Sequence, residues 1–250
     1  MIQKIKVGAV SYLNTKPLIY GFEQGQMKDE IDLVIDYPAN IASFLLNGQV
    51  DIGLVPVAVI PFLKEYQIIS NYCIGCDGEV ASVCLFSDVP LNQVEIVLLD
   101  YQSRTSVELL KILLEDHWQV SPKLVNATAD YEAQIQGTTA GLVIGDRALK
   151  QRSGSKYIYD LGTAWKEMTG LPFVFAAWIS NKALSPGFIE KFNKANEVGV
   201  NSLDLIVQQE QYKQYDLHRY YTENISYTLD EKKKTGMELF LEKLYLKQTT

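Results

Sequence analysis

The stretch that decides the fold is VGAVSYLNTKPLIYGF, residues 7–22. It opens on the apolar segment Val7–Val10, typical of a short buried strand, and continues into the polar cluster Ser11–Thr15. Pro17 follows, and proline fits the first turn of a helix because it has no N–H to donate. We therefore expect hydrogen-bonding groups at one edge of an α/β sheet, the edge where such sheets bind ligands. An ordinary turn with a polar helix cap is the alternative.

The composition is that of a folded, acidic protein. The chain has 250 residues, of which 47% are hydrophobic and 21% are charged, enough for one large core or two medium ones. Its net charge of −7 comes without a basic stripe, which argues against nucleic acid as the main partner.

Neither a leader nor a membrane span is expected. The first residues, MIQKIKVGAV, are strand-like and contain no long apolar run. The odd number of cysteines suits a reducing compartment, and we expect a soluble cytoplasmic protein with no membrane partner. Cys73 and Cys76 form a C-x-x-C, but neither a second thiol pair nor nearby histidines complete a metal site. We expect plain buried or turn cysteines and no metal.

Strand and helix periods alternate along the chain. A strand is expected at DIGLVPV and another at 94–100, followed by a helix that opens with the capping box Thr105–Glu108. Short helices are expected at VIPFLKEY and YEAQIQ, and a further strand at 140–145. After the apolar strand 172–180 the chain is expected to be helical, with a second capping box at Thr228 and Glu231. This alternation predicts an α/β protein.

The helical tail bears on the domain organisation. It lacks strands of its own, so it must bury its apolar faces on one of two α/β units. We expect two lobes, 1–88 with 175–250 and 89–174, linked by crossing strands near 84–90 and 172–178. A ligand would then bind in the cleft between the lobes.

The strongest candidate segments lie where an expected strand ends and a turn or helix starts: Ser11–Thr15, Val55–Val57, Ser103–Ser106 and Gly145–Arg147. Hydroxyl and N–H groups at a helix N-terminus bind anions, and Arg104 can grip a carboxylate with two hydrogen bonds. A well-capped helix with a surface arginine is the alternative. No glycine-rich phosphate loop occurs in the chain, which favours a carboxylate over a nucleotide.

Few residues of the chain are typical of acid–base, nucleophilic or metal-dependent catalysis. Ser82 lies on an apolar strand near a crossing, where it is either a small core residue or a cleft residue, and Asp146 suits a helix cap. His117 and His218 both lie in helical contexts, so neither a catalytic triad nor a histidine metal site can be drawn. We expect any enzyme activity to need no metal or other cofactor.

Ordered motifs, however, identify a family. They are SYLNTKPL, DIGLVPVA, SRTSVELL, GDRAL and DLGTAWKEMTGLPFVFAAW, and in this order the chain resembles the menaquinone biosynthesis family of the futalosine route from about residue 4 to 185. The resemblance implies the fold of type II periplasmic binding proteins, with two crossover strands and an interlobe active site, in a cytoplasmic enzyme.

The resemblance also implies site residues. Asn14 and Ser82 would be catalytic. Ser103, Arg104 and Thr105 would line the carboxylate end of the cleft, and Gly145 and Asp146 the opposite wall. With the neighbouring polar segments, the full set expected to bind substrate is Ser11, Tyr12, Val55, Pro56, Ser103, Arg104, Thr105, Ser106, Gly145 and Asp146.

The implied reaction is the dehydration of chorismate to 3-[(1-carboxyvinyl)oxy]benzoate, catalysed by a carbon–oxygen lyase (hydro-lyase). A sister enzyme that forms 1,4-dihydroxy-6-naphthoate carries a catalytic histidine where this chain has Gly145-Asp146, so that activity is disfavoured. A non-catalytic protein that binds or senses a small carboxylate is the other alternative, since fold alone does not fix function. The oligomeric state stays open.

Overall fold

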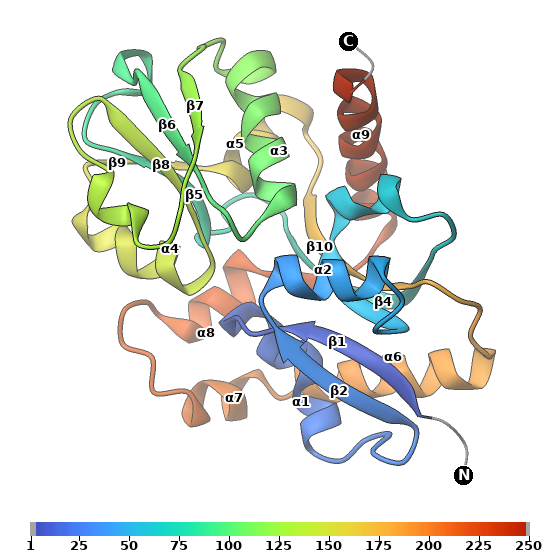
Figure 1. Ribbon diagram of the computed structural model, residues 1–250. Coiled ribbons are helices and arrows are strands. Elements are labelled where there is room, and N and C mark those ends of the chain that lie inside the picture. The colour runs from blue at the N-terminus through green and yellow to red at the C-terminus, as the bar shows by residue number, and fades with distance from the viewer. Residues whose placement is uncertain (1–3, 249–250) are drawn as a thin grey trace.

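Two β-sheets form the framework of the protein (Figure 1). The computed structural model describes residues 4–248. Within these residues the first sheet has six strands in the order β11-β4-β10-β3-β1-β2, and the second has five in the order β7-β6-β8-β5-β9. The strands of the first sheet are β1 Ile5–Val10, β2 Ile31–Asp36, β3 Ile52–Pro56, β4 Gln67–Cys76, β10 Phe173–Ser180 and β11 Ser226–Thr228. Those of the second are β5 Val83–Ser87, β6 Ile96–Leu99, β7 Lys123–Asn126, β8 Thr139–Ile144 and β9 Tyr157–Asp160.

The sheets are mixed, as the alternation of strands and helices predicts. β1 pairs in parallel with β2 and β3, whereas β10 runs antiparallel to β3 and β4. The helices α1 (Lys16–Glu23) and α2 (Pro38–Leu46) make the connections between the parallel strands. Every residue of β3 and β10 is buried, which explains why these strands read as unbroken apolar runs.

The chain passes between the sheets twice, at 77–82 after β4 and at 161–172 before β10. The strands expected to cross near 84–90 and 172–178 do not do so, because β5 pairs only within the second sheet and β10 only within the first among the described residues. The second passage contains α5 (Leu161–Thr169). Taking these crossings as limits, we propose that the second lobe begins near Val83 rather than at residue 89.

The C-terminal tail returns to the first sheet. Its first helix, α6 (Pro186–Val200), packs against α1 so closely that glycine is required at two contacts. A Cβ at Gly21 would lie 2.1 Å from the carbonyl oxygen of Ala195, and one at Gly199 would lie 1.8 Å from that of Pro17. The tail was expected to be helical almost throughout, yet it also supplies β11, which pairs with β4. The remaining tail helices are α7 Leu203–Gln209, α8 Leu217–Arg219 and α9 Glu231–Gln248.

The last helix, α9, touches both lobes (Figure 1). Phe240 packs edge-on against Trp165 of α5, with ring centroids 6.3 Å apart. Lys243 pairs with Asp116 of the second lobe, with Nζ and Oδ2 2.8 Å apart. The tail therefore contributes to both halves of the molecule.

Several local predictions were wrong. The side chain that caps α3 (Arg104–Ile112) is Ser103, not Thr105. The backbone N–H of Lys233 at the start of α9 donates to Asp230, so Thr228 is not the cap there. Finally, the expected helices at VIPFLKEY and YEAQIQ are only the 3₁₀ turns Val57–Phe62 and Tyr131–Gln134.

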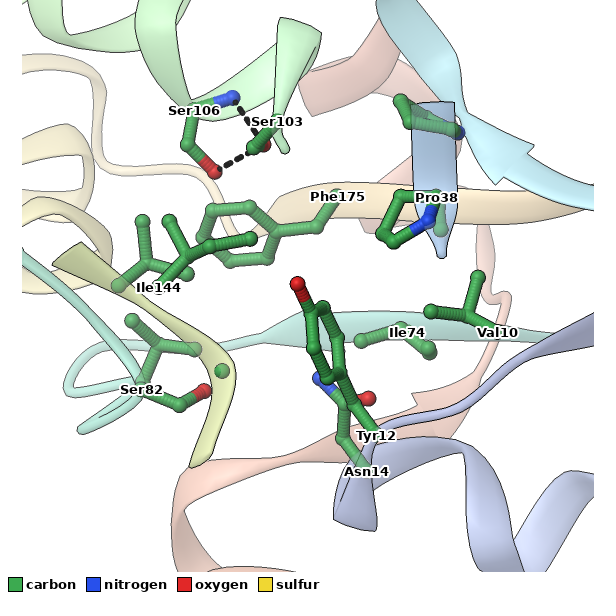
Figure 2. Close-up of a pocket in the computed structure, with 15 residues that line it drawn as sticks. Val10, Tyr12, Asn14, Pro38, Ile74, Ser82, Ser103, Ser106, Ile144 and Phe175 are labelled. Carbon is green, nitrogen blue, oxygen red and sulfur yellow. Dashed lines mark hydrogen bonds between the residues drawn. The ribbon is translucent and has the colours of Figure 1, made fainter. Parts of the chain in front are cut away.

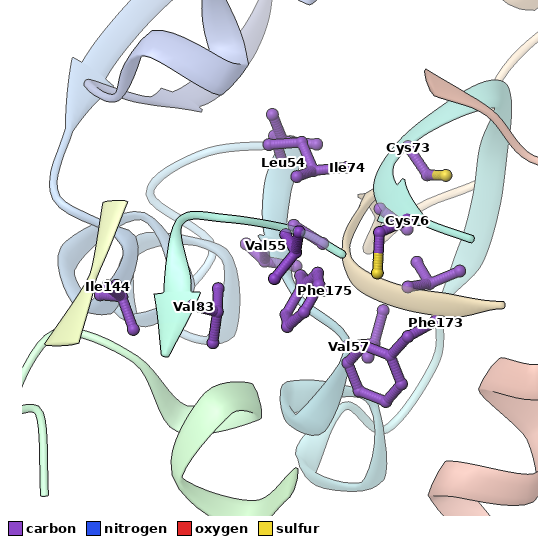
Figure 3. Packing of buried hydrophobic residues seen from close by; sticks show 14 of the residues in the cluster. Leu54, Val55, Val57, Cys73, Ile74, Cys76, Val83, Ile144, Phe173 and Phe175 are labelled. Carbon is purple, nitrogen blue, oxygen red and sulfur yellow. The ribbon is translucent and has the colours of Figure 1, made fainter. Parts of the chain in front are cut away.

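One apolar core continues from the first sheet to the second (Figure 3). Figure 3 shows Phe175 and Val55 of the first sheet near Val83 and Ile144 of the second. All the cysteines are free and buried, Cys73, Cys76 and Cys84, and burial raises the pKa of each thiol. They are packing residues, as expected. Between residues 4 and 248, no helix combines the length and apolar character that spanning a bilayer requires.

Candidate active site

A pocket lies between the two sheets, at the ends of several strands (Figure 2). The pocket and its open mouth together hold about 510 Å³ of space that no atom fills. The lining includes the last residues of β1, β3 and β8, together with the N-terminus of α3 and the middle of β10. Its residues are Val10, Tyr12, Asn14, Pro38, Pro56, Ile74, Val80, Ser82, Val83, Ser103, Ser106, Ile144, Gly145, Phe175 and Ala176.

One side of the pocket presents Asn14 and Ser82. Asn14 lies in the one-turn 3₁₀ segment Leu13–Thr15 that follows β1, and its residue is 9% exposed. Ser82 ends the first crossing between the sheets and is fully buried. Residues far apart in the sequence therefore meet here, at the strand edge that the sequence predicts as a binding site.

Both side chains contact the hydroxyl of Tyr220. The Tyr220 hydroxyl donates to Ser82 Oγ at 2.8 Å, and the Asn14 side chain lies near enough to the same hydroxyl to lower its pKa. Tyr220 opens the π-helical turn Tyr220–Asn224 in the tail, and burial raises its pKa well above the ordinary value. We call Asn14, Ser82 and Tyr220 the assembled wall.

Sequence reasoning missed Tyr220, and other tail tyrosines resemble it. Tyr227 donates to the backbone carbonyl of Asn14 at 3.1 Å, and Tyr212 donates to that of Asp146 at 3.0 Å. The signal in the sequence is a tail rich in tyrosine, but nothing local to these residues points to a pocket. The tail holds the site segments from behind.

The other side of the pocket is the N-terminus of α3, formed by Ser103 and Ser106, which we call the helix wall (Figure 2). Ser103 Oγ accepts the backbone N–H of Ser106 at 3.1 Å and also contacts Ser106 Oγ at 2.8 Å. The helix dipole makes this end favourable for a negative charge.

Arg104 and Thr105 are not among the described residues that line the pocket. The Thr105 hydroxyl instead accepts the backbone N–H of Ala58 at 3.1 Å, a contact between the lobes. Arg104 is exposed and borders a separate surface hollow beside Phe62 and Tyr101. The structure thus turns the predicted carboxylate-binding arginine away from the pocket.

Tyr12 lies between the two walls (Figure 2). Its hydroxyl donates to Gln102 Oε1, and its ring lies against Gly145. Gly145 has a φ of +62°, and a Cβ there would lie 3.2 Å from the Tyr12 ring. Its N–H donates to the carbonyl of Ser82 at 2.8 Å. Both the positive φ and the close approach of the Tyr12 ring therefore favour glycine at this point.

Asp146 stands outside the described pocket lining. Its Oδ1 accepts the backbone N–H of Leu13 at 3.1 Å, which links the second lobe to the segment that carries Asn14. Burial raises its pKa to about 6, while the Leu13 N–H opposes that shift. Asp146 therefore links the two lobes through this hydrogen bond.

A buried ion pair lies behind the helix wall. Arg147, in α4 (Gly145–Gln151), approaches Asp100 Oδ2 at 2.7 Å and Glu132 at 2.7 Å. The Asp100 side chain is fully buried, and it also accepts the hydroxyl of Tyr131 at 2.8 Å and the backbone N–H of Gln102 at 2.7 Å. Burial raises the pKa of Asp100 and Arg147 opposes the shift. This network anchors the loop that leads to Ser103.

The structure brings some of the predicted site residues together in the pocket lining and places the others outside it. Of the predicted residues, the pocket lining contains Tyr12, Asn14, Pro56, Ser82, Ser103, Ser106 and Gly145. The described residues that stand outside it are Ser11, Val55, Arg104, Thr105 and Asp146. The lining that the structure describes carries no carboxylate, amine, guanidinium or imidazole. It offers apolar surface, hydroxyl groups, an amide and backbone N–H groups.

Comparison with known proteins identifies the family of this chain. Residues 5–246 match the family model described as menaquinone biosynthesis. The chain belongs to this family. The chain is also similar to the chorismate dehydratase of Thermus thermophilus, with 28% identity over 235 residues. That match covers 84% of this chain and 85% of the relative.

Solved structures show the fold. A protein of Archaeoglobus fulgidus superimposes with a TM-score of 0.78 at 17% identity, covering 99% of this chain and 98% of that one. The alkanesulfonate-binding protein SsuA of Xanthomonas axonopodis pv. citri gives a TM-score of 0.62 at 11% identity, covering 97% and 91%. The chain has the two-lobed α/β fold of periplasmic binding proteins, as the sequence motifs imply.

Proposed function

We propose that this protein is a cytoplasmic hydro-lyase that dehydrates chorismate to 3-[(1-carboxyvinyl)oxy]benzoate for menaquinone biosynthesis. The family match and relatives named chorismate dehydratase support the substrate. The observation that carries the proposal is a pocket whose apolar walls hold Asn14 and Ser82 on one side and a helix N-terminus on the other. Such a pocket suits a ring with polar substituents at its edge.

The chemistry needs little from the protein. Chorismate loses the proton on C3 and then the hydroxyl on C4, which add up to one water molecule, and the ring becomes aromatic. The C3 proton is vinylogous to the ring carboxylate, so the electron pair left by its departure delocalises into that group. The pocket then has to hold the ring, bind the carboxylates and stabilise the charge that develops.

We assign roles to the two walls on this basis. The N-terminus of α3, with Ser103 and Ser106, binds one carboxylate through its N–H and hydroxyl groups. Asn14 and Ser82 hydrogen-bond the departing hydroxyl or the enolpyruvyl side chain. Phe175 and Ile144 cover the ring, since both line the pocket with apolar surface.

The proton acceptor in this scheme belongs to the substrate. The described lining offers neither a carboxylate nor an imidazole, and Asp146 stands outside it. The enolpyruvyl carboxylate of chorismate is attached to C3 through the ether oxygen, so it lies near the C3 proton. We propose that this carboxylate takes the proton.

A protein that binds a small carboxylate without converting it is the competing function. The likeness to the alkanesulfonate-binding protein favours it, because that protein shares the fold. Incubating the purified protein with chorismate and separating the products by chromatography distinguishes the two. Formation of 3-[(1-carboxyvinyl)oxy]benzoate supports the dehydratase. Chorismate that is retained unchanged in a stable complex overturns it.

A further inference from the structure

The hydroxyl of Tyr220 connects the two polar side chains of the assembled wall. Tyr220 lies 138 residues from Ser82 in the sequence, and their hydroxyl oxygens are 2.8 Å apart. Tyr220 itself is not among the described residues that line the pocket, so it touches Ser82 and Asn14 from behind. Its effect on a ligand therefore passes through these two side chains.

In its 2.8 Å hydrogen bond to Ser82 Oγ the Tyr220 hydroxyl is the donor, and this uses its one proton. The Asn14 side chain lies beside the same hydroxyl and lowers its pKa, against the larger effect of burial. Because Ser82 Oγ already accepts a proton from behind, its own O–H is free to turn toward the pocket that Ser82 lines.

We propose that Tyr220 is a positioning residue that makes Ser82 a hydrogen-bond donor to the oxygen of the bound ligand. The hydrogen bonds then run in one direction, from Tyr220 to Ser82 and from Ser82 to the ligand. Hydrogen bonds aligned in this way polarise one another and strengthen the last donor. The inference rests on the proposed function, in which that ligand oxygen is the departing C4 hydroxyl.

The environment of Tyr220 suits this role. The residue is fully buried, and its ring packs against those of Tyr215 and Tyr221 with centroids 6.2 and 5.6 Å away. Such packing leaves the hydroxyl little freedom to change partners. Burial also raises the pKa of the phenol well above its ordinary value, which favours the protonated form that can donate.

Tyr221 supplies a matched control. It is the next residue, it is 1% exposed, and its hydroxyl is the side-chain polar atom that is buried without a hydrogen-bond partner in the part of the chain that the structure describes. Tyr221→Phe therefore removes the same atom from a similar environment without breaking a hydrogen bond. Tyr220→Phe removes the hydroxyl that Ser82 and Asn14 contact.

The experiment measures chorismate turnover and thermal unfolding for the wild type, Tyr220→Phe, Tyr221→Phe, Ser82→Ala and the double variant Tyr220→Phe with Ser82→Ala. We expect kcat of Tyr220→Phe to fall roughly tenfold or more, with a much smaller change in KM, and Tyr221→Phe to match the wild type. In the Ser82→Ala background, loss of the Tyr220 hydroxyl has little further effect on kcat, because the donor it orients is already absent.

Other outcomes overturn the inference. If Tyr220→Phe lowers only the unfolding temperature and keeps the wild-type kcat, the residue is structural. If the two substitutions multiply their effects on kcat, Tyr220 does not act through Ser82. A wild type with no turnover refutes the proposed function instead, and crystal structures of the wild type and Tyr220→Phe then decide the inference. An unchanged Ser82 rotamer in the variant contradicts it, and a rotated one supports it.

Discussion

The two walls of the pocket differ in how the chain builds them. The hydrogen bond between Ser103 and Ser106 in the helix wall joins residues that are three apart, whereas the bond between Tyr220 and Ser82 in the assembled wall joins residues 138 apart. The helix wall is a local structure that forms wherever the sequence caps a helix. The assembled wall exists only when both crossings and the tail are in place. We expect substitutions in the assembled wall to affect catalysis and those in the helix wall to affect binding and local stability.

The largest expected effect comes from the ion pair behind the helix wall. Arg147→Ala leaves the fully buried Asp100 carboxylate without its cation and should lower the free energy of unfolding by about 3–5 kcal/mol. Arg104→Ala, on the exposed face of α3, should stay within about 0.5 kcal/mol of the wild type. Urea unfolding of both variants at neutral pH checks this. A loss for Arg147→Ala as small as the one expected for Arg104→Ala would show that the network contributes little to the helix wall.

The next effect concerns the assembled wall directly. Ser82→Ala removes a donor from the pocket and should lower kcat for chorismate about 100-fold. It also leaves the buried Tyr220 hydroxyl without its acceptor, at a cost of about 1–3 kcal/mol of stability. Steady-state kinetics on folded enzyme separates the two consequences. A variant with near-normal turnover would remove Ser82 from the mechanism.

A smaller effect is a pH dependence of the stability, caused by Asp146, whose hydrogen bond to Leu13 joins the two lobes. The pKa of Asp146 rises from 3.8 to about 6, so the folded protein holds its proton more tightly than the unfolded chain does. The free energy of unfolding should therefore fall as the pH rises through this interval. Asp146→Asn keeps an oxygen for the Leu13 N–H and removes the share of this dependence that Asp146 causes, with a gain on the order of 2 kcal/mol at pH 7. Parallel stability curves for variant and wild type between pH 4 and pH 7 would contradict this assignment.

The smallest effect is expected for the cap of the helix wall. Ser103→Ala should cost about 1 kcal/mol of stability and raise KM for chorismate several-fold, with kcat little changed. Ser185→Ala is the matched control, because Ser185 caps α6 in the same way without lining the pocket among the described residues. It should show the stability loss alone. Equal KM values for the two variants would separate the helix wall from substrate binding.

The same contrast explains what the sequence could predict. Strand ends and helix starts are local, so the segments of Asn14, Ser103 and Gly145 could be located from apolar periods and turn residues. Which way a side chain points is not local. Arg104 faces outward because Ser103 takes the cap position and its neighbours Thr105 and Ser106 are the buried ones.

Tertiary contacts explain the remaining differences. Both Ser103 and Thr105 have the spacing of a helix cap, and only the contact between Thr105 and the N–H of Ala58 decides between them. β11 has three residues in a helical context and forms because the edge of β4 is available to pair with it. Tyr220 could not be found, because its partners lie in segments that meet only in the folded molecule.

The path of the chain through the sheets also has a consequence for biosynthesis. The second sheet uses one continuous stretch, from Val83 to Asp160, whereas the first needs strands from both ends of the chain. As a protein emerges from the ribosome its early segments fold first, so the second lobe can form while the first still waits for β10 and β11. Tyr220 and Tyr227 are translated after β10 and after every strand of the second sheet. A nascent chain therefore completes its assembled wall after its helix wall, and a message cut short before these codons yields a protein with a helix wall and no assembled wall.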